Sequence, residues 1–166
     1  MELSKTYELE RKFLLKQIPN IEYINELNIK QYYLQSKENI VKRIREVITD
    51  SAKYYYTEKI YDGLYTEEKE VLISREEFIN FKENAVSSIE KVRKIYYDGN
   101  RNWEIDVFTN INLIIAELEF ISDSSSLDKT NKKLNEYLIP DFIKNNMVLE
   151  ITHMKDFSNA ALSVLI

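Results

Sequence analysis

The chain has 166 residues, a net charge of −5 and no cysteine; 44% of its residues are hydrophobic and 31% are charged. This length and composition predict one globular domain spanning residues 1–166, and the absence of cysteine excludes disulfide frameworks and cysteine-based metal or redox sites. No apolar run reaches the about 18 residues of a membrane span and the N-terminus lacks a signal-like apolar core, so we expect a cytoplasmic protein without a membrane partner.

Alternation of apolar and polar residues predicts about nine strands, because residues i, i+2 and i+4 of a strand point to the same side. In chain order the expected strands are Tyr7–Leu15, Ile29–Ser36, Val41–Ile48, Lys53–Tyr61, Tyr65–Ile73, Glu90–Tyr97, Trp103–Phe108, Leu113–Ile121 and Val148–Thr152. Both glycines follow an aspartate, as Asp62-Gly63 and Asp98-Gly99, between expected strands. Asp-Gly in that position favours a tight hairpin turn.

Helices are expected between and after these strands. Ser74 with Glu77 three residues later forms a capping box, which predicts a helix as far as about Val86. The other expected helical segments are Asp128–Leu138 before Pro140, a turn at Ile21–Leu27 after Pro19, and a short C-terminal helix capped by Ser158 or Asn159.

Charged residues of one sign recur two positions apart on successive strands. They are Glu8 and Glu10, Arg43 and Arg45, Glu68 and Glu70, Lys91 and Arg93, Glu104 and Asp106, and Glu117 and Glu119, with Lys12, Lys59 and Glu150 on matching faces. Like charges side by side do not stabilise a sheet. The pattern fits either an open sheet face where the two signs neutralise each other, or a closed barrel with a charged interior and an apolar exterior under helices.

The two kinds of charged pair suit different chemistry. Clustered carboxylates without histidine or cysteine favour a hard cation such as Mg²⁺ or Mn²⁺. Clustered arginine and lysine favour phosphate, and one ligand that needs both is a metal-bound polyphosphate. Its hydrolysis would use water activated by the metal or by a lysine of lowered pKa. The net negative charge argues against a nucleic-acid partner.

The order of the charged strands resembles the CYTH superfamily, also called triphosphate tunnel metalloenzymes. The family includes inorganic and thiamine triphosphatases, class IV adenylate cyclases and fungal-type RNA triphosphatases. The matching segments are Glu8-Leu9-Glu10-Arg11-Lys12, Gln31-Tyr32-Tyr33-Leu34, Arg43-Ile44-Arg45, Thr57-Glu58-Lys59, Glu68-Lys69-Glu70, Lys91-Val92-Arg93, Trp103 to Phe108, Ala116-Glu117-Leu118-Glu119 and Glu150-Ile151-Thr152. The resemblance implies an α+β fold: an eight-stranded antiparallel β-barrel, or tunnel, with a charged lumen and helices packed outside.

The resemblance also implies a role for each charged residue. The expected metal ligands are Glu8, Glu10, Glu117 and Glu119, with Asp106 assisting a second metal. The expected phosphate contacts are Lys12, Arg43, Arg45, Lys59 and Arg93, with Tyr33 as a further substrate contact. Lys91 is the expected activator of water, an alternative to the second metal. Glu68, Glu70, Glu104 and Glu150 are expected to orient the lysine and arginine side chains. Asp106 is expected to do the same where it does not assist a second metal.

The leading prediction is metal-dependent hydrolysis of inorganic triphosphate by a monomer or homodimer. The alternatives are a thiamine or nucleoside triphosphatase, a class IV-type adenylate cyclase and, from another class, a polyphosphate binder without activity. Three positions depart from the family pattern: Tyr32 and His153 replace glycine, and Lys94 replaces an aromatic residue. These departures affect the expected loop geometry and the shape of the tunnel mouth. They do not affect the charged residues expected in the lumen.

Overall fold

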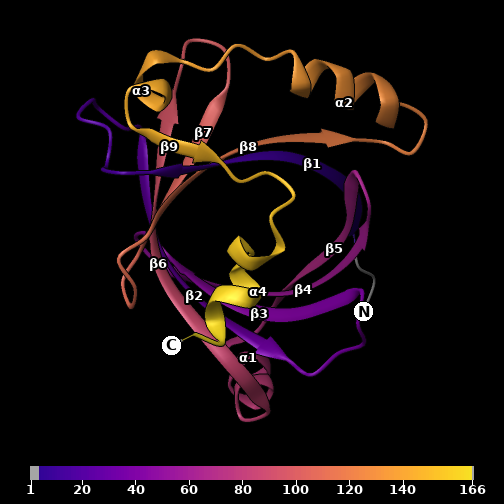
Figure 1. Ribbon diagram of the computed structural model, residues 1–166. Helices are drawn as coiled ribbons and strands as arrows, with labels where there is room; N and C mark the ends of the chain where they lie inside the picture. The colour runs from indigo at the N-terminus through magenta and orange to yellow at the C-terminus, as the bar shows by residue number, and fades with distance from the viewer. Residues whose placement is uncertain (1–3, 166) are drawn as a thin grey trace.

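The computed structural model describes residues 4–165, in which nine strands and four α-helices follow the chain (Figure 1). The strands are β1 (Ser4–Leu15), β2 (Asn25–Leu34), β3 (Ile40–Ile48), β4 (Ala52–Asp62), β5 (Tyr65–Ile73), β6 (Ala85–Tyr97), β7 (Asn102–Phe108), β8 (Ile114–Ser122) and β9 (Met147–Glu150). The helices are α1 (Arg75–Lys82), α2 (Leu127–Asn135), α3 (Asp141–Lys144) and α4 (Asn159–Ser163), with a 3₁₀ turn at Lys155–Phe157.

Eight of the strands form a closed antiparallel barrel. Their order around the ring is β5-β4-β3-β2-β6-β7-β8-β1, and pairing of β1 with β5 completes it. The expected eight-stranded barrel is therefore confirmed, with β9 as an additional strand outside the ring. The open sheet face that the charge pattern also allowed is excluded because the sheet closes on itself.

Strand β1 changes partner along one edge. Its first residues pair with β5 as far as Glu8, whereas Phe13 to Leu15 pair with β9. Two residues that follow β9 hydrogen-bond to Lys12 on the same edge: Ile151 N donates to Lys12 O at 2.8 Å, and Lys12 N donates to Thr152 Oγ1 at 2.9 Å. Residues that follow β9 thus extend its pairing with β1 as far as Lys12, while the pairing of β1 with β5 closes the ring.

Helices cover the outer face of the barrel where that face is apolar. Leu134 of α2 and Ile143 of α3 pack on Leu9, Trp103 and Leu118, which point outward from β1, β7 and β8. Phe78 of α1 packs on the outward side of β3 to β5. The capping box that begins α1 is present, with Ser74 Oγ accepting from Glu77 N at 3.1 Å.

The inner face is charged in the middle of the barrel and apolar at one end. At that end Ile89, Phe108 and Ile115 point inward and pack with Leu162 of α4, which is 4% exposed. Figure 1 shows α4 lying in this opening of the barrel. Apolar positions at the end of the inward rows therefore bury the C-terminal segment, which occupies the opening.

Two sequence predictions were wrong about helices. Ile21–Leu27 is not helical, because β2 begins at Asn25 and its first residues pair with β6, Asn25 opposite Ile95. The helix that begins after Ser74 ends at Lys82 and does not reach Val86, since Ala85 already starts β6. Pairing with another strand outweighs local helical preference at both places. In residues 4–165 no helix has the length and apolar character needed to span a membrane.

Candidate active site

A cavity of about 300 Å³ lies in the charged part of the lumen. Alternation along the strands turns most of the predicted site residues into it. The predicted residues that line it are Glu8, Glu10, Lys12, Tyr33, Arg43, Arg45, Lys59, Glu68, Glu70, Arg93, Glu104, Glu117 and Glu119. The structure thus brings these side chains from all eight strands of the barrel to one cavity.

One side of the cavity, which we call the acidic wall, consists of Glu8 and Glu10 of β1 and Glu117 and Glu119 of β8. Glu10 lies directly opposite Glu119 in the register of the two strands. Burial, and then repulsion by Glu8 and Glu104, raises the pKa of Glu119 to about 9. Burial also raises the pKa of Glu8 to about 7, against the opposing effect of Lys59. Burial therefore favours the protonated form of these two carboxylates, and repulsion between neighbouring carboxylates adds to this effect.

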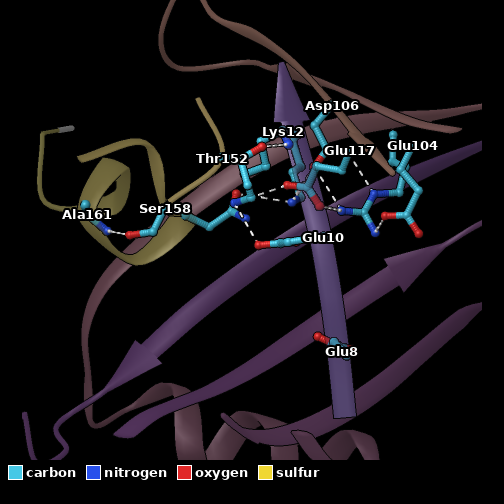
Figure 2. A network of polar contacts seen from close by, with 12 residues as sticks. Glu8, Glu10, Lys12, Glu104, Asp106, Glu117, Thr152, Ser158 and Ala161 are labelled. Atoms are coloured by element: carbon cyan, nitrogen blue, oxygen red, sulfur yellow. Dashed lines mark hydrogen bonds and ion pairs between the residues drawn. The ribbon is translucent and has the colours of Figure 1, made fainter. Parts of the chain in front are cut away.

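Two lysines lie against these carboxylates. Lys59 Nζ is 3.1 Å from both Glu8 Oε2 and Glu68 Oε2. Lys12 Nζ lies 3.4 Å from Glu117 Oε1 and 3.6 Å from Glu10 Oε1 (Figure 2). Burial lowers the pKa of each lysine, but these carboxylates outweigh it and raise both values. Across residues 4–165 no group of three acidic or histidine side chains has the geometry to hold a metal ion.

The opposite side of the cavity, which we call the basic wall, consists of Arg43 and Arg45 of β3 with Tyr33 of β2. Strands β3 and β8 lie on opposite sides of the ring. Both arginine side chains are buried, yet Arg43 Nε and Arg45 Nε have no hydrogen-bond partner among the described residues. Burial and the charge of Arg43 lower the pKa of Arg45. Positive charge on this wall is thus incompletely satisfied.

Tyr33 adds a hydroxyl donor to the basic wall. Its oxygen accepts a hydrogen bond from Gln31 Nε2 at 2.9 Å. Gln31 is fully buried next to it on β2, and Arg43 lies opposite Tyr33 in the strand register. Because the Tyr33 oxygen already accepts, its own proton is available to a ligand in the cavity.

Carboxylates on other strands hold the bases in place. Glu70 Oε2 lies 3.3 Å from Arg45 Nη2 and accepts from Thr57 Oγ1 at 2.8 Å. Glu68 Oε2 is 4.0 Å from Arg43 Nη2, and burial competes with Lys59 to leave the pKa of Glu68 lowered to about 2. Glu104 pairs with Arg93. These contacts agree with the orienting role proposed for the three glutamates.

Lys91 and Asp106 lie beneath the cavity and do not line it. Asp106 is fully buried, and both its oxygens are used: Arg93 Nε donates to Oδ1 at 2.7 Å, and Lys91 Nζ donates to Oδ2 at 2.7 Å. These contacts are those of a residue that orients Arg93 and Lys91, and assistance by Asp106 to a second metal stays a prediction. Burial, followed by the charge of Arg93, lowers the pKa of Lys91 to about 8 although Asp106 opposes this.

Glu150 is also placed differently from the prediction. Its carboxylate accepts from Arg11 Nε at 2.7 Å, and its side chain is 40% exposed. Arg11 points outward from β1, where its guanidinium also donates to the carbonyl oxygen of Tyr137. Glu150 consequently orients a base outside the barrel and contacts none in the lumen.

Sequence reasoning missed the contribution of the C-terminal segment. Ser158, Asn159 and Ala160 line the cavity, and Asn159 Oδ1 accepts from Lys91 Nζ at 3.2 Å. The sequence showed Ser158 and Asn159 only as candidate helix caps. Ser158 does cap α4, accepting from Ala161 N at 3.1 Å (Figure 2). No charge pattern marked their position in the lumen.

A second cavity of about 580 Å³ adjoins the first, because Glu104 and Glu119 line both. It opens at the end of the barrel away from α4. Its other lining residues are Ile24, Asn25, Ile95, Tyr97, Asn100, Arg101 and Asn102. This end of the lumen is less charged and carries an exposed tyrosine ring.

Comparison with solved structures finds the same fold. The chain is similar to the inorganic triphosphatase NE1496, with a TM-score of 0.62 and 26% identity, covering 96% of this chain and 95% of that one. A conserved hypothetical protein from Pyrococcus furiosus gives 0.62 and 25% over 78% of this chain and 86% of its own. PH1819 from Pyrococcus horikoshii OT3 gives 0.69 at 15% identity over 95% and 97%, a likeness of fold alone.

Comparison by sequence is less informative. No protein-family model matches the chain. A Plasmodium falciparum protein named "Putative autophagy-related protein 11" is 29% identical over 125 residues, which are 71% of this chain. The chain spans 9% of the length of that relative.

The closed barrel, the order of the charged strands around its lumen and the likeness to NE1496 agree with one another. Together they show that the chain has the fold of the CYTH superfamily.

Proposed function

We propose that this protein is a metal-dependent triphosphatase that hydrolyses inorganic triphosphate. One observation carries the proposal: carboxylates cluster on one wall of a single cavity, and two buried arginines lie on the opposite wall. Glu119 on the acidic wall has its pKa raised to about 9, and Arg43 Nε and Arg45 Nε on the basic wall lack partners among the described residues. A metal-bound polyphosphate presents a cation to one wall and anionic oxygens to the other.

The acidic wall fits a divalent cation by the chemistry of its donors. Its members offer only carboxylate oxygens, which Mg²⁺ and Mn²⁺ prefer. Burial, with repulsion from other carboxylates, raises the pKa of Glu8 and Glu119, and a bound cation would favour the ionised form of both. Glu8, Glu10, Glu117 and Glu119 would hold it. When bound, the ion would neutralise these carboxylates and polarise phosphoryl oxygens.

The basic wall and the two lysines supply the donors for phosphate. Arg43 and Arg45 offer guanidinium N–H groups that can bind two oxygens at once, and Tyr33 offers its hydroxyl proton. Lys12 and Lys59 neutralise the acidic wall in the structure described here. With a cation on that wall, both ammonium groups would be released to donate to phosphoryl oxygens.

Activation of the attacking water by Lys91 remains a prediction. The pKa of about 8 that burial gives this lysine suits a general base near neutral pH. Its ammonium group, however, contacts Asp106 and Asn159 and does not line the cavity. Lys91 could therefore take a proton from a water molecule in the cavity only if its contact with Asn159 changed.

The second cavity favours a second candidate, an organic triphosphate. Ile24, Ile95 and the exposed ring of Tyr97 offer an apolar contact surface next to the triphosphate cavity. A thiamine or nucleoside group attached to the terminal phosphate could occupy it. Inorganic triphosphate would leave this cavity unused.

The test is phosphate release from tripolyphosphate, thiamine triphosphate and ATP, each with Mg²⁺, with Mn²⁺ and with chelator. We expect tripolyphosphate to give the highest kcat/KM and chelator to stop release. A higher kcat/KM for an organic triphosphate would identify the second candidate. Tight binding of all three without phosphate release would instead show a polyphosphate-binding protein and overturn the proposal.

A further inference from the structure

The C-terminal segment places one polar side chain between Lys91 and the cavity. Asn159 lines the cavity, whereas Lys91 is 2% exposed and lies behind it. The two residues are 68 positions apart and meet through the 3.2 Å hydrogen bond from Lys91 Nζ to Asn159 Oδ1. Asn159 is therefore the side chain through which this end of the cavity meets the buried lysine.

The chemistry of Lys91 determines which way the Asn159 amide faces. A protonated lysine has three donors and no acceptor, so only the amide oxygen can face it. Asp106 Oδ2, 2.7 Å from the same Nζ, keeps the ammonium form paired. The Asn159 Nδ2 group must then point away from Lys91. In the part of the chain that the structure describes, no acceptor pairs with Nδ2.

Donors as well as carboxylates line the cavity that Asn159 enters, and no hydrogen bond joins Asn159 Nδ2 to any of these carboxylates among the described residues. Lys12, Tyr33 and Arg43 line the same cavity, and all three can donate to an anion. An amide N–H adds another donor without adding a further positive charge beside Arg43, which already repels Arg45. The group that completes such a set of donors is an oxyanion.

We propose that Asn159 is a substrate-binding residue, whose Nδ2 donates to a phosphoryl oxygen at the α4 end of the cavity. The inference rests on the proposed function, because the oxyanion is taken to be part of the triphosphate. Lys91 acts here as the positioning residue, since its hydrogen bond to Oδ1 directs Nδ2 into the cavity.

The position of Asn159 depends on how the C-terminal segment is seated. Leu162 is buried among apolar side chains of the barrel, and Ser163 Oγ lies 2.7 Å from Ser87 Oγ of β6. Neither residue lines the cavity. Ser163→Ala therefore loosens the seat of α4 without removing a group from the cavity, and it is the matched control.

The experiment compares Asn159→Ala, Asn159→Asp and Ser163→Ala with the parent protein. Melting temperatures first establish that each variant folds. We expect Asn159→Ala to weaken tripolyphosphate binding, measured by calorimetry and as KM, by about tenfold or more, as for loss of a hydrogen bond to a charged group. Asn159→Asp should be weaker still, because a carboxylate keeps the acceptor for Lys91 but removes the donor and repels phosphate.

The outcomes separate the possible roles of Asn159. Binding by Asn159→Asp equal to or tighter than that of the parent would overturn the proposal, because the amide would then serve only to accept from Lys91. An equal loss in Ser163→Ala would also overturn it, in favour of an effect of seating. If the parent protein binds tripolyphosphate without releasing phosphate, the proposed activity fails while calorimetry still decides the role of Asn159.

Discussion

The acidic and basic walls of the lumen have a similar arrangement of like charges on a strand, but they respond differently to the burial of those charges. Each contains a pair of like charges two residues apart on one strand, Glu117 with Glu119 on β8 and Arg43 with Arg45 on β3. On the acidic wall burial and then repulsion raise the pKa of Glu119, whereas on the basic wall the buried Nε groups of both arginines lack a partner among the described residues. Carboxylates can relieve repulsion by taking up a proton, but arginine stays protonated, so its excess charge remains until an anion binds.

The lumen tolerates so much charge because most of its charged side chains contact a residue of opposite charge. Lys12 and Lys59 reach across to carboxylates, and Glu68 and Glu70 reach across to arginines, so each wall is partly neutralised by neighbours. Buried pairs of this kind contribute little net stability, because desolvation offsets their attraction. The arrangement thus favours exchange of internal partners for a ligand of both signs.

The largest effect should come from the acidic wall. Glu119→Gln removes a carboxylate that the proposed metal needs, so kcat with Mg²⁺ should fall by about 100-fold or more, beyond the loss typical of residues that only support metal ligands. Phosphate release over a Mg²⁺ titration measures it. Glu46→Gln, on the outer side of β3, is the control and should match the parent. Full activity in Glu119→Gln would remove the residue from the metal site.

Ligand binding should stabilise the fold through both walls together. Tripolyphosphate with Mg²⁺ at 100 times its dissociation constant should raise the free energy of unfolding by about 2.7 kcal/mol. Thermal melts with each component alone and with both would show whether the walls act together. Sulfate should act weakly in the same direction through the basic wall. An unchanged melting temperature with every ligand would mean that the charged cavity is not a binding site.

Weakening the basic wall should affect binding more than folding. Arg45→Ala should cost about 1.5–3 kcal/mol of tripolyphosphate affinity, as expected for a charge-assisted hydrogen bond. The ligand-free protein should be no less stable, since Arg45 is repelled by Arg43. Calorimetry and melting curves measure the two effects, with Lys42→Ala on the outer side of β3 as the control. Parent-like affinity in Arg45→Ala would contradict the phosphate-binding role of the wall.

The smallest effect should be a pH dependence of stability in the metal-free protein. Glu119 and Glu8 have folded-state pKa values of about 9 and 7, above the ordinary value of 4.5. The folded state therefore holds these protons more tightly than the unfolded chain, so the free energy of unfolding should fall as pH rises from 5 to 8. The lowered pKa of Lys91 acts in the opposite sense, mainly above pH 8.

Chemical denaturation at several pH values measures this slope. Glu119→Gln should flatten it, because the neutral amide has no proton to lose. Mg²⁺ should recover stability at pH 8 in the parent protein and much less in the variant. A metal-free parent that becomes more stable between pH 5 and 8 would show that the acidic wall is already neutralised.

The direction of each charged side chain was predictable from sequence, but its depth in the barrel was not. Alternation places Lys12, Arg93 and Glu119 on the inner face without saying how far each lies from either end. Lys91 is two residues from Arg93 on that face, yet it is covered by Asn159 while Arg93 lines the cavity. Depth depends on the stagger between strands and on α4, and both arise from contacts between distant residues.

The errors in secondary structure have a related origin. Asn25 and Ala85 belong to β2 and β6, where each strand runs beyond its own sequence signal because the other strand pairs with it. Glu150 follows the alternation of an inward row but lies on β9, outside the ring. Pairing with the neighbouring strand sets the ends of β2 and β6 and the position of β9. A single sequence does not show which strands will be neighbours or in what register they pair.

The change of partner along β1 has a consequence for how the chain folds. Strand β1 pairs with β8 and β9, and Arg11 meets Glu150 across 139 residues. Contacts of such long range make loop closure costly and folding slow. Until β8 emerges, the edge of β1 that pairs with β8 is open, and Glu8, Glu10 and Lys12 give one face of the strand charges that oppose aggregation. The residues proposed to bind metal and phosphate in the finished barrel would thus also protect the nascent chain.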